Sequence, residues 1–273
     1  MRFVCGQYTL DLSTPKVMGI VNVTPDSFSD GGRYASSLKA VSHALQLVEE
    51  GADILDIGGE STRPSAVPVS LQEELDRVMP VLESLIRQVN IPISIDTYKP
   101  QVMQTAIAVG ASMINDIRAL QEEGALGVVA NSNAGVCLMH MQGLPQTMQE
   151  HPHYEDVVND VKHFLMTRLQ TAQDAGIQAS RIVLDPGFGF GKTREHNIAL
   201  AKNLGVLCAL GQPVLVGLSR KSVLGQVTGN EVDARVHASV AAAVISAMKG
   251  AKILRVHDVA ATKEALKIVS AID

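Results

Sequence analysis

The stretch with the clearest chemical signals runs from Arg181 to Thr193, with the sequence Arg-Ile-Val-Leu-Asp-Pro-Gly-Phe-Gly-Phe-Gly-Lys-Thr. Its apolar residues 182–184 predict a short buried strand that ends at Asp185. Pro186 then withholds a backbone donor, and three alternate glycines predict a loop with exposed backbone. A carboxylate between a buried strand and such a loop is typical of a ligand anchor.

The glycine pattern differs from two phosphate-binding motifs. A P-loop needs a glycine five residues before the Gly-Lys pair, where this chain has Pro186. The dinucleotide fingerprint Gly-x-Gly-x-x-Gly does not fit the spacing Gly187, Gly189, Gly191. These motifs are therefore excluded, and the two phenylalanines between the glycines favour a functional loop over a plain turn.

Asp96, Asn115 and Asp185 each follow a short apolar run. Carboxylate and amide groups offer hydrogen-bonding atoms in fixed directions. If the fold brings them together, these three residues can hydrogen-bond along the edge of a flat, nitrogen-rich heterocycle. They form a candidate ring-binding set.

Basic and hydroxyl side chains form a second set in a chain whose net charge is −5. The set comprises Arg63, Arg255, His257 and the run Ser219-Arg220-Lys221-Ser222. Such donors suit a phosphate or diphosphate group. The pattern therefore predicts an anion-binding half of the same site.

Two loops are longer than simple connectors need to be. The first spans residues 24–37 and carries Phe28 and Asp30, and the second spans residues 61–70 and carries Thr62, Arg63 and two prolines. Loops of this kind can close over a substrate and exclude water.

Short apolar runs alternate with amphipathic segments, and this alternation predicts the elements that position these residues. Strands are predicted at residues 17–21, 54–57, 91–95, 112–114, 136–139, 182–184, 214–216 and 253–256. Helices are predicted at residues 37–50, 71–88, 100–109, 123–131, 154–175, 195–209, 232–249 and 259–271. Eight βα units predict a (β/α)₈ TIM barrel, whose active site lies at the carboxyl ends of the strands. A doubly wound open sheet is the alternative.

The chain has no Ser/Gly/Pro-rich linker, so one domain over residues 1–273 is expected. Residues 1–14 are expected to form a hairpin that caps the barrel, turning about Gly6 and Gln7. The core must be aliphatic, because the chain has no Trp and only 3% aromatic residues.

Composition bounds the protein's surroundings and partners. No Lys/Arg cluster argues for nucleic acid, and the sequence shows neither a signal peptide nor a membrane span. Three widely spaced cysteines fit neither a disulfide framework nor a zinc site, and they favour a reducing compartment. A cytoplasmic protein is expected. The small-residue segment 238–247 fits either an ordinary packed helix or part of a dimer face.

Four segments together closely resemble the dihydropteroate synthases of bacterial folate synthesis, and the matches extend from Asn22 to Asp258. The segments are Met18-Gly19-Ile20-Val21-Asn22-Val23-Thr24-Pro25-Asp26-Ser27-Phe28-Ser29-Asp30-Gly31-Gly32, Asp56-Ile57-Gly58-Gly59-Glu60-Ser61-Thr62-Arg63-Pro64, Asp185-Pro186-Gly187-Phe188-Gly189-Phe190-Gly191-Lys192 and Ser219-Arg220-Lys221-Ser222. The resemblance implies a TIM barrel that joins 6-hydroxymethyl-7,8-dihydropterin diphosphate to 4-aminobenzoate and releases diphosphate. It also implies a homodimer and, as a cofactor, Mg²⁺.

The resemblance assigns roles to residues. For the pterin it implies Asp96, Asn115, Met139, Asp185 and Lys221. For the diphosphate it implies Asn22, Ser61, Thr62, Arg63, Arg255 and His257, with Asn22 as the magnesium-linked residue. For aminobenzoate it implies Phe28, Thr62, Pro64, Phe190, Lys221 and Ser222. The residues expected to act in catalysis are Asp96, Lys221, Arg255 and Asp30.

The chemistry implied is dissociative, because diphosphate is a good leaving group and the electron-rich dihydropterin can delocalise the charge left on its methylene carbon. Ser65, Tyr98 and Ala238 depart from the family's pattern, and Ser65 bears on the sulfonamide sensitivity that the family implies. Two rival functions remain: a methyl-carrier barrel that binds a methylated folate, and a non-catalytic binding protein. The first would not need Arg63, Arg255 and His257.

Overall fold

The computed structural model describes residues 1–23, 32–61 and 66–272. In this part of the chain, eight parallel strands form one sheet in the order β8-β7-β6-β5-β4-β3-β10-β9. The strands are β3 (Lys16–Asn22), β4 (Ile54–Gly58), β5 (Ile93–Asp96), β6 (Met113–Asp116), β7 (Gly135–Met139), β8 (Ile182–Asp185), β9 (Leu215–Val216) and β10 (Ile253–Val256). A parallel bridge between Leu184 and Val214 joins the two ends of this order. The predicted (β/α)₈ barrel is confirmed, and the open sheet is excluded.

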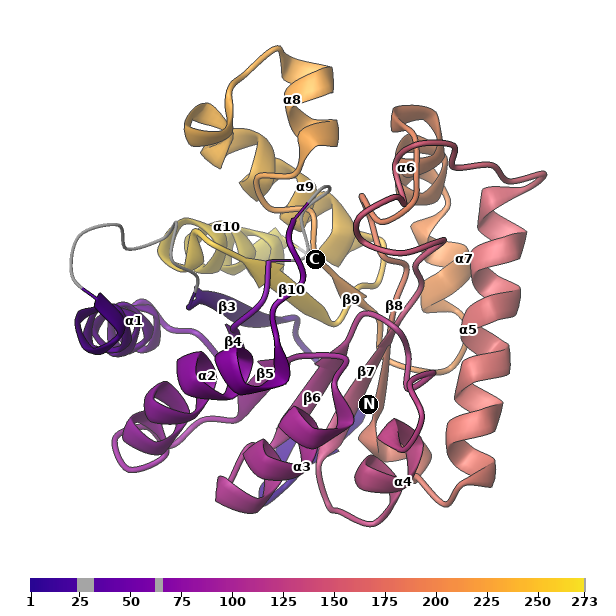
Figure 1. Cartoon of the computed structure of the whole chain (residues 1–273). Coiled ribbons are helices and arrows are strands. Elements are labelled where there is room, and N and C mark those ends of the chain that lie inside the picture. The colour runs from indigo at the N-terminus through magenta and orange to yellow at the C-terminus, as the bar shows by residue number, and fades with distance from the viewer. Residues whose placement is uncertain (24–31, 62–65, 273) are drawn as a thin grey trace.

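Helices lie around the outside of the strands (Figure 1). They are α1 (Gly32–Glu49), α2 (Leu71–Leu85), α3 (Pro100–Val109), α4 (Ala125–Ala130), α5 (Val157–Asp174), α6 (Arg194–Lys202), α7 (Leu204–Cys208), α8 (Ser222–Thr228), α9 (Val236–Met248) and α10 (Val259–Ile272). Short 3₁₀ turns lie at Ala179–Arg181 and Val232–Ala234. None of the helices in the described ranges is long and apolar enough to cross a lipid bilayer.

Several predicted helices differ from the observed ones. Helix α1 begins at Gly32, inside the predicted loop 24–37, and α2 ends at Leu85, before the predicted end at residue 88. The segment 195–209 is two helices, because the backbone leaves the helical region at Asn203, where φ is −102° and ψ is 18°. The helix predicted from Tyr154 begins only at Val157, since the Asp156 side chain accepts hydrogen bonds from the backbone N–H groups of Val158 and Asn159. The segment 232–249 starts as a 3₁₀ turn, and α8 was not predicted because it is a short helix inside a loop.

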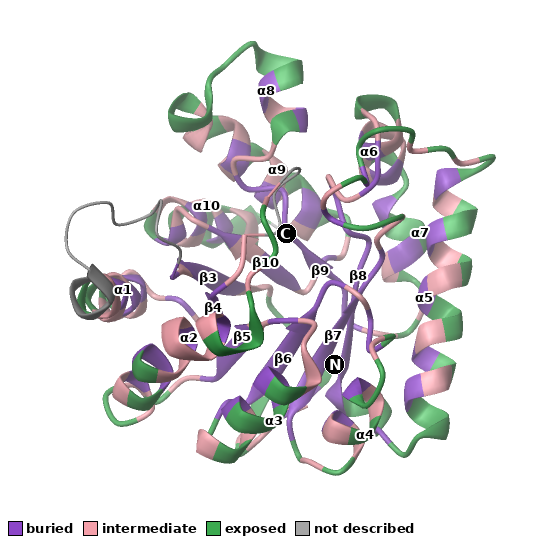
Figure 2. Cartoon of the chain, viewed as in Figure 1, coloured by how far each residue is buried: buried purple, intermediate pink, exposed green. Residues whose placement is uncertain are grey.

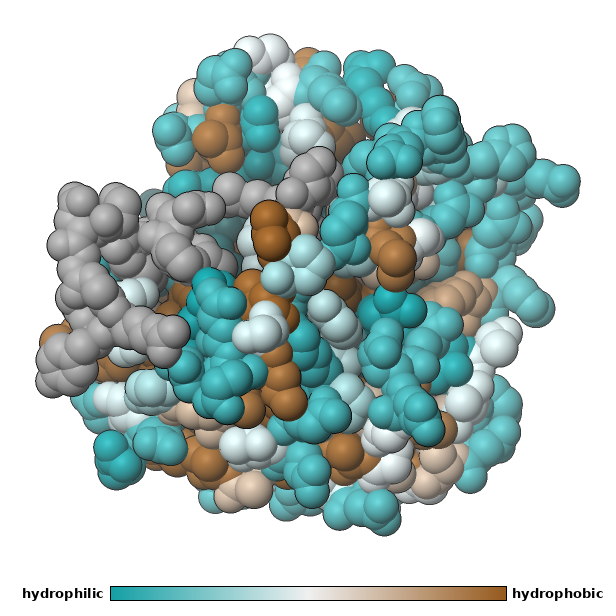
Figure 3. Space-filling view, viewed as in Figure 1, coloured by the Kyte–Doolittle hydropathy of each residue, from teal (hydrophilic) through white to brown (hydrophobic). Residues whose placement is uncertain are grey.

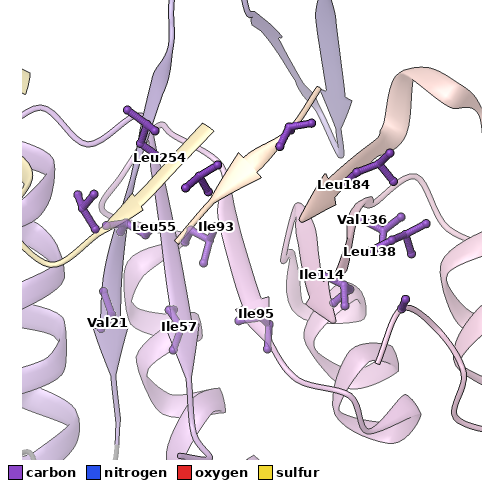
Figure 4. Close-up of a cluster of buried hydrophobic side chains, with 14 of the residues drawn as sticks. Val21, Leu55, Ile57, Ile93, Ile95, Ile114, Val136, Leu138, Leu184 and Leu254 are labelled. Atoms are coloured by element: carbon purple, nitrogen blue, oxygen red, sulfur yellow. The ribbon is translucent and has the colours of Figure 1, made fainter. Parts of the chain in front are cut away.

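Period-two alternation along the strands separates two apolar clusters. One cluster fills the layer between the barrel and the helices, and Figure 4 shows part of it, including Val21, Ile57, Ile95, Leu138 and Leu254. Figure 2 shows the matching pattern, with buried strands surrounded by helices that are buried on one face and exposed on the other. The outer layer is aliphatic, as the composition predicts.

The second cluster lies inside the barrel and includes the N-terminal hairpin. Strands β1 (Arg2–Cys5) and β2 (Tyr8–Asp11) pair antiparallel, and Phe3 and Cys5 pack with residues from the starts of the barrel strands, such as Ile54 and Met113. Gly135 is required at this contact, because a Cβ there would lie 2.5 Å from the Phe3 ring. The hairpin thus packs against the amino-terminal end of the barrel.

Candidate active site

The inner face of the barrel changes from apolar to polar along the strands. Inward positions at the strand starts are apolar, as at Ile54 of β4 and Met113 of β6. Two residues further along, the same faces carry Asp56 and Asn115, and β5 carries Ser94 and Asp96 at alternate positions. Because the side-chain period is two, the polar groups gather at the carboxyl ends of the strands.

A network of ion pairs and hydrogen bonds joins four of these polar residues. Arg255 Nε donates to Asp56 Oδ2 at 2.6 Å, and Arg255 Nη2 donates to Asp96 Oδ2 at 2.8 Å. Asn115 Nδ2 donates to the same Asp56 oxygen at 3.0 Å. The network links β4, β5, β6 and β10 across the barrel. Arg255, Asp96 and Asn115 therefore share one site, as the sequence predicts.

The charges in this network shift each other's pKa. Burial raises the pKa of Asp96 to about 7, against the lowering effect of the Arg255 charge, and the neighbouring acids raise it further. Burial lowers the pKa of Arg255, but Asp56 and Asp96 together outweigh that effect and hold it above the ordinary value. The guanidinium therefore stays charged, whereas Asp96 titrates near neutral pH.

Asp185 and Lys221 form the next part of the site. Asp185 Oδ1 accepts a hydrogen bond from the backbone N–H of Gly187 at 2.7 Å, and burial raises the pKa of this carboxyl. Lys221 Nζ donates to the Phe188 carbonyl and lies 4.6 Å from the centre of the Phe190 ring. Burial lowers the pKa of Lys221 to about 8, although Asp185 opposes this shift. The charges of Asp185, Lys221 and Arg255 also shift one another's pKa.

Close backbone approach sets the shape of the glycine loop after β8. Gly187 and Gly191 have φ values of +66° and +61°, and a Cβ on either would lie within 2.5 Å of a carbonyl oxygen, from His140 or Gln142. Only glycine satisfies both conditions. The loop therefore lies directly against the segment that follows β7.

The buried Lys192 holds the glycine loop in place. Its Nζ donates to the carbonyls of Gly187 at 2.8 Å and Phe190 at 3.0 Å, and it lies 2.9 Å from His140 Nδ1. Burial, reinforced by the Lys192 charge, lowers the pKa of His140 to about 2, so the imidazole is neutral. Asn197 adds a second contact by accepting from the Gly189 N–H at 2.8 Å.

A third group of polar residues lies in the segments that follow β9 and β10. Ser219 Oγ lies 3.0 Å from His257 Nδ1 and accepts from the His257 backbone N–H at 3.1 Å. Arg220 has φ of +58° and donates from Nε and Nη2 to both oxygens of Asp258, at 3.1 and 2.6 Å. Asp258 therefore engages two guanidinium nitrogens of Arg220.

Several predicted site residues lie outside the described ranges. They are Phe28 and Asp30 of the first loop, and Thr62, Arg63 and Pro64 of the second, as is the departure Ser65. Among the described residues, Asn22 ends β3 half-buried and Met139 ends β7 buried. Ser61 lies three residues after the end of β4, and Ser222 begins α8 exposed. All four stand at carboxyl ends of strands or in the segments that follow them.

Asp56 and Lys192 were not predicted as site residues. Asp56 is a fully buried charge within the apolar run Ile54-Leu55-Asp56-Ile57, and that contrast is the signal that would have identified it. Lys192 gave no separate signal, because a lysine at a loop end is ordinarily solvated.

A cleft of about 280 Å³ lies at the opposite end of the barrel, beside the hairpin turn. Its lining includes Tyr8, Ile86, Ile107 and Ser112 and contains no charged side chain. Because its lining has no charged side chain, it is not the candidate active site.

Comparison with known proteins identifies the class first. Residues 18–257 match the family described as pterin binding enzyme. Together with the barrel and the polar groups at its carboxyl end, this match shows a pterin-binding (β/α)₈ enzyme.

Individual relatives narrow the class. The dihydropteroate synthase of Haemophilus influenzae is 52% identical over 268 residues, which cover 98% of each chain. The solved structure of Xanthomonas albilineans dihydropteroate synthase with 4-aminobenzoic acid has a TM-score of 0.94 and 53% identity, and the match covers 99% of this chain and 97% of that one. The same enzyme in complex with 7,8-dihydropteroate has a TM-score of 0.92 and 51% identity, with coverage of 100% and 98%. The chain belongs to the dihydropteroate synthase family.

Proposed function

We propose that this protein condenses 6-hydroxymethyl-7,8-dihydropterin diphosphate with 4-aminobenzoate, giving 7,8-dihydropteroate and diphosphate. The observation that carries the proposal is that acid and amide groups for a ring lie beside half-buried cations, in the group Asp96, Asn115, Asp185, Lys221 and Arg255. A ring rich in N–H donors suits the acids, and its diphosphate tail suits the cations.

For the pterin we propose the acceptors Asp96, Asn115 and Asp185, with Lys221 at the ring edge and Met139 packing against the ring. Support comes from their burial, since Asn115 and Asp185 are 4% and 6% exposed. Because these groups are buried, a ligand that cannot hydrogen-bond to them leaves them unpaired. The site therefore discriminates strongly against such ligands.

For the diphosphate we propose Arg255 and His257 with Ser61, Thr62 and Arg63 of the second loop. Arg255 remains charged at any pH at which the enzyme works, because two carboxylates support its proton. His257 is positioned by its contacts with Ser219.

Magnesium is the proposed cofactor, and Asn22 would hold it. The Asn22 amide oxygen at the end of β3 is a hard donor of the kind that Mg²⁺ prefers. Within the described ranges no group of three or more His, Cys, Asp or Glu side chains could bind a metal alone. A single protein oxygen is still sufficient, since Mg²⁺ on a diphosphate takes most of its ligands from phosphate and water. When bound, Mg²⁺ neutralises charge on the departing diphosphate.

For aminobenzoate we propose Phe28, Thr62, Pro64, Phe190, Lys221 and Ser222. The described part of this set supports the proposal, because the Lys221 ammonium lies over the Phe190 ring. A cation beside an aromatic ring can bind a benzoate, with the carboxylate facing the charge.

We propose a dissociative reaction. The bond between the methylene carbon and the diphosphate oxygen breaks, and the electron pair leaves with diphosphate. The cation that remains is delocalised into the dihydropterin ring, near Asp96 and, from the first loop, Asp30. The neutral amine of aminobenzoate forms the new C–N bond with its lone pair and then releases a proton to solvent. The protein supplies no covalent nucleophile.

The test is diphosphate release by the purified chain with the pterin diphosphate, Mg²⁺ and aminobenzoate. Release that requires aminobenzoate supports this function, and its absence in a folded, pterin-bound sample refutes it. Arg255→Ala should slow diphosphate departure more than it weakens binding of a pterin without a diphosphate. An unchanged rate would remove Arg255 from this role.

The same assay separates the rival functions. A methyl-carrier barrel would bind a methylated folate and release no diphosphate, and a non-catalytic protein would bind pterin without turnover. The half-buried Arg255 beside the ring-binding acids favours the synthase, because a methyl carrier has no anion to hold there.

We also propose a cytoplasmic homodimer. All three cysteines are free, which suits a reducing compartment. Helix α9 supports a partner, because Ser239 and Ser246 are buried against the barrel whereas Ile245 and Met248 are 52% and 62% exposed. A helix with serines inside and aliphatic side chains outside suits an interface on its outer face.

A further inference from the structure

Asp56 lies beneath the residues that face the ligand. It is fully buried on β4, and its Oδ2 atom accepts hydrogen bonds from two side chains that come from other strands, Asn115 on β6 and Arg255 on β10. No partner for its Oδ1 atom exists among the described residues. A buried carboxylate with one oxygen doubly engaged and one unengaged is costly to maintain, so a role beyond packing is expected.

The bond to Asp56 determines which end of the Asn115 amide is left for the ligand. A carboxylate paired with a guanidinium can only accept hydrogen bonds, so Asn115 must turn its NH₂ group toward Asp56. The Asn115 carbonyl oxygen then remains as an acceptor. Without Asp56 the amide could rotate by half a turn and offer a donor instead.

The neighbouring ligand-facing groups have the same polarity. Asp96 and Asp185 carry carboxylate oxygens, and Asp96 lies opposite Asn115 in the register of β5 and β6. With the Asn115 oxygen presented as well, the three groups form a set of acceptors that matches a ring edge made of N–H donors. A donor at the Asn115 position would break this match.

We propose that Asp56 is a specificity-determining positioning residue, an inference that rests on the proposed function. The Asp56 carboxylate fixes the Asn115 amide so that the amide oxygen faces the pterin. The same carboxylate holds the Arg255 guanidinium by accepting a hydrogen bond from Arg255 Nε. Asp56 itself need not touch the substrate. Asp56 thereby gives the site a preference for a ring with a 2-amino group over a ring with a carbonyl group at that position.

The experiment compares binding of 6-hydroxymethylpterin with binding of the corresponding lumazine, in which a carbonyl replaces the 2-amino group. Asp56→Ala should weaken pterin binding by about tenfold or more and reduce the preference for pterin over lumazine by about threefold or more. The KM for aminobenzoate should change by less than about twofold, because Asp56 does not position that substrate.

Ser94→Ala is the matched control. Ser94 lies opposite Asp56 in the register of β4 and β5, is fully buried, and has no hydrogen-bond partner for its hydroxyl among the described residues. This variant should leave pterin binding and ring preference unchanged. An unchanged ring preference in Asp56→Ala, or an equal loss in Ser94→Ala, would overturn the proposal.

If Asp56→Ala does not fold, exchanging the two residue types tests the contact between Asp56 and Asn115. Asn115→Asp alone sets two carboxylates against each other and should lose pterin affinity. Adding Asp56→Asn restores an amide beside a carboxylate and should recover about fivefold or more of that loss. No recovery would refute the pairing. Binding is measured without aminobenzoate, so it can be tested separately from the reaction. A wild-type protein that forms no dihydropteroate refutes the proposed function. An unaltered ring preference in the variants refutes only the role of Asp56.

Discussion

Burial and charge pairing act in opposite directions on the ionisable residues of the site. Burial disfavours the charged form of Asp96 and of Lys221, so the pKa of the acid rises to about 7 and the pKa of the amine falls to about 8. Both groups therefore change charge close to neutral pH, within a narrow interval. Arg255 does not, because its two carboxylate partners support its proton.

This arrangement predicts a bell-shaped pH dependence of kcat/KM for the pterin diphosphate. Activity should rise as pH increases through about 7, where Asp96 becomes the anion that stabilises the cation, and fall above about 8, where Lys221 loses its charge. Asp96→Asn should remove the acid limb and lower the rate, and Lys221→Arg should move the alkaline limb upward. A flat profile between about pH 6 and about pH 9 would contradict the assignment.

The glycine loop after β8 is organised by side chains rather than by its own sequence preferences. Lys192 Nζ donates hydrogen bonds to the carbonyls of Gly187 and Phe190, and Asn197 Oδ1 accepts one from the N–H of Gly189. These bonds place Phe188 inside the core and leave Phe190 half-buried beside Lys221. The loop is thus a fixed wall of the site.

Lys192→Met keeps most of the side-chain volume but leaves the Gly187 and Phe190 carbonyls without their donor. We expect a loss of about 2 kcal/mol in the free energy of unfolding, because buried unpaired acceptors are costly. The KM for aminobenzoate should rise more than the KM for the pterin diphosphate, because Phe190 belongs to the set proposed for aminobenzoate. Lys202→Met, at an exposed position of α6, is the control and should behave as the wild type. Equal changes in both KM values would show that Lys192 acts on the whole site.

The hairpin contributes to stability at the other end of the barrel. Phe3 is fully buried against Gly135, so Phe3→Ala should lower the free energy of unfolding by about 3–5 kcal/mol. Denaturant unfolding measures this change, and Val4→Ala at the neighbouring half-buried position should cost much less. Pterin binding in the surviving folded protein should be unaffected, since the site lies at the opposite end. Weakened pterin binding at full folding would indicate coupling through the barrel.

The whole chain carries an excess of acidic residues, and the site holds two cations, Lys221 and Arg255, among its acids. The net charge is −5, and the face shown in Figure 3 is largely hydrophilic, with scattered apolar side chains. Exposed aliphatic residues also occur on α9 and α10, where Ile245, Met248, Ile268 and Ile272 are 52% to 76% exposed. Because α9 and α10 pack side by side, these residues can contribute to one interface.

Association through α9 predicts a particle of two 29.1 kDa chains in light scattering or sedimentation. Ile245→Glu should dissociate it, because a charge at an apolar contact must be desolvated to rebuild the interface. Met166→Glu on α5, which is 40% exposed in the wild type, is the control and should leave the mass unchanged. A wild-type protein at the monomer mass would refute the dimer. A dimer that survives Ile245→Glu would show that the interface lies elsewhere.

Local signals in the sequence were sufficient for the barrel and for the positions of Asp96, Asn115 and Asp185 at the carboxyl ends of its strands. Apolar runs of strand length, glycine stops such as Gly110 and Gly250, and polar residues directly after strands are all properties of neighbouring residues. They predicted the order of elements and the end of the barrel that bears Asp96, Asn115 and Asp185. The helix boundaries near Asn203 and Val157 were wrong because caps and loop contacts decide such ends.

Which groups touch one another was decided only by the tertiary structure. Asp56 and Arg255 are separated by 199 positions in the chain, and Lys192 and His140 by 52. No local pattern encodes such a pair, because closure of the barrel brings the two partners together. The sequence by itself determined the barrel and the kinds of chemical group at its carboxyl end. Closure of the sheet decided that Asp56 contacts Asn115 and Arg255, and packing of the glycine loop against the segment after β7 decided that Lys192 is buried.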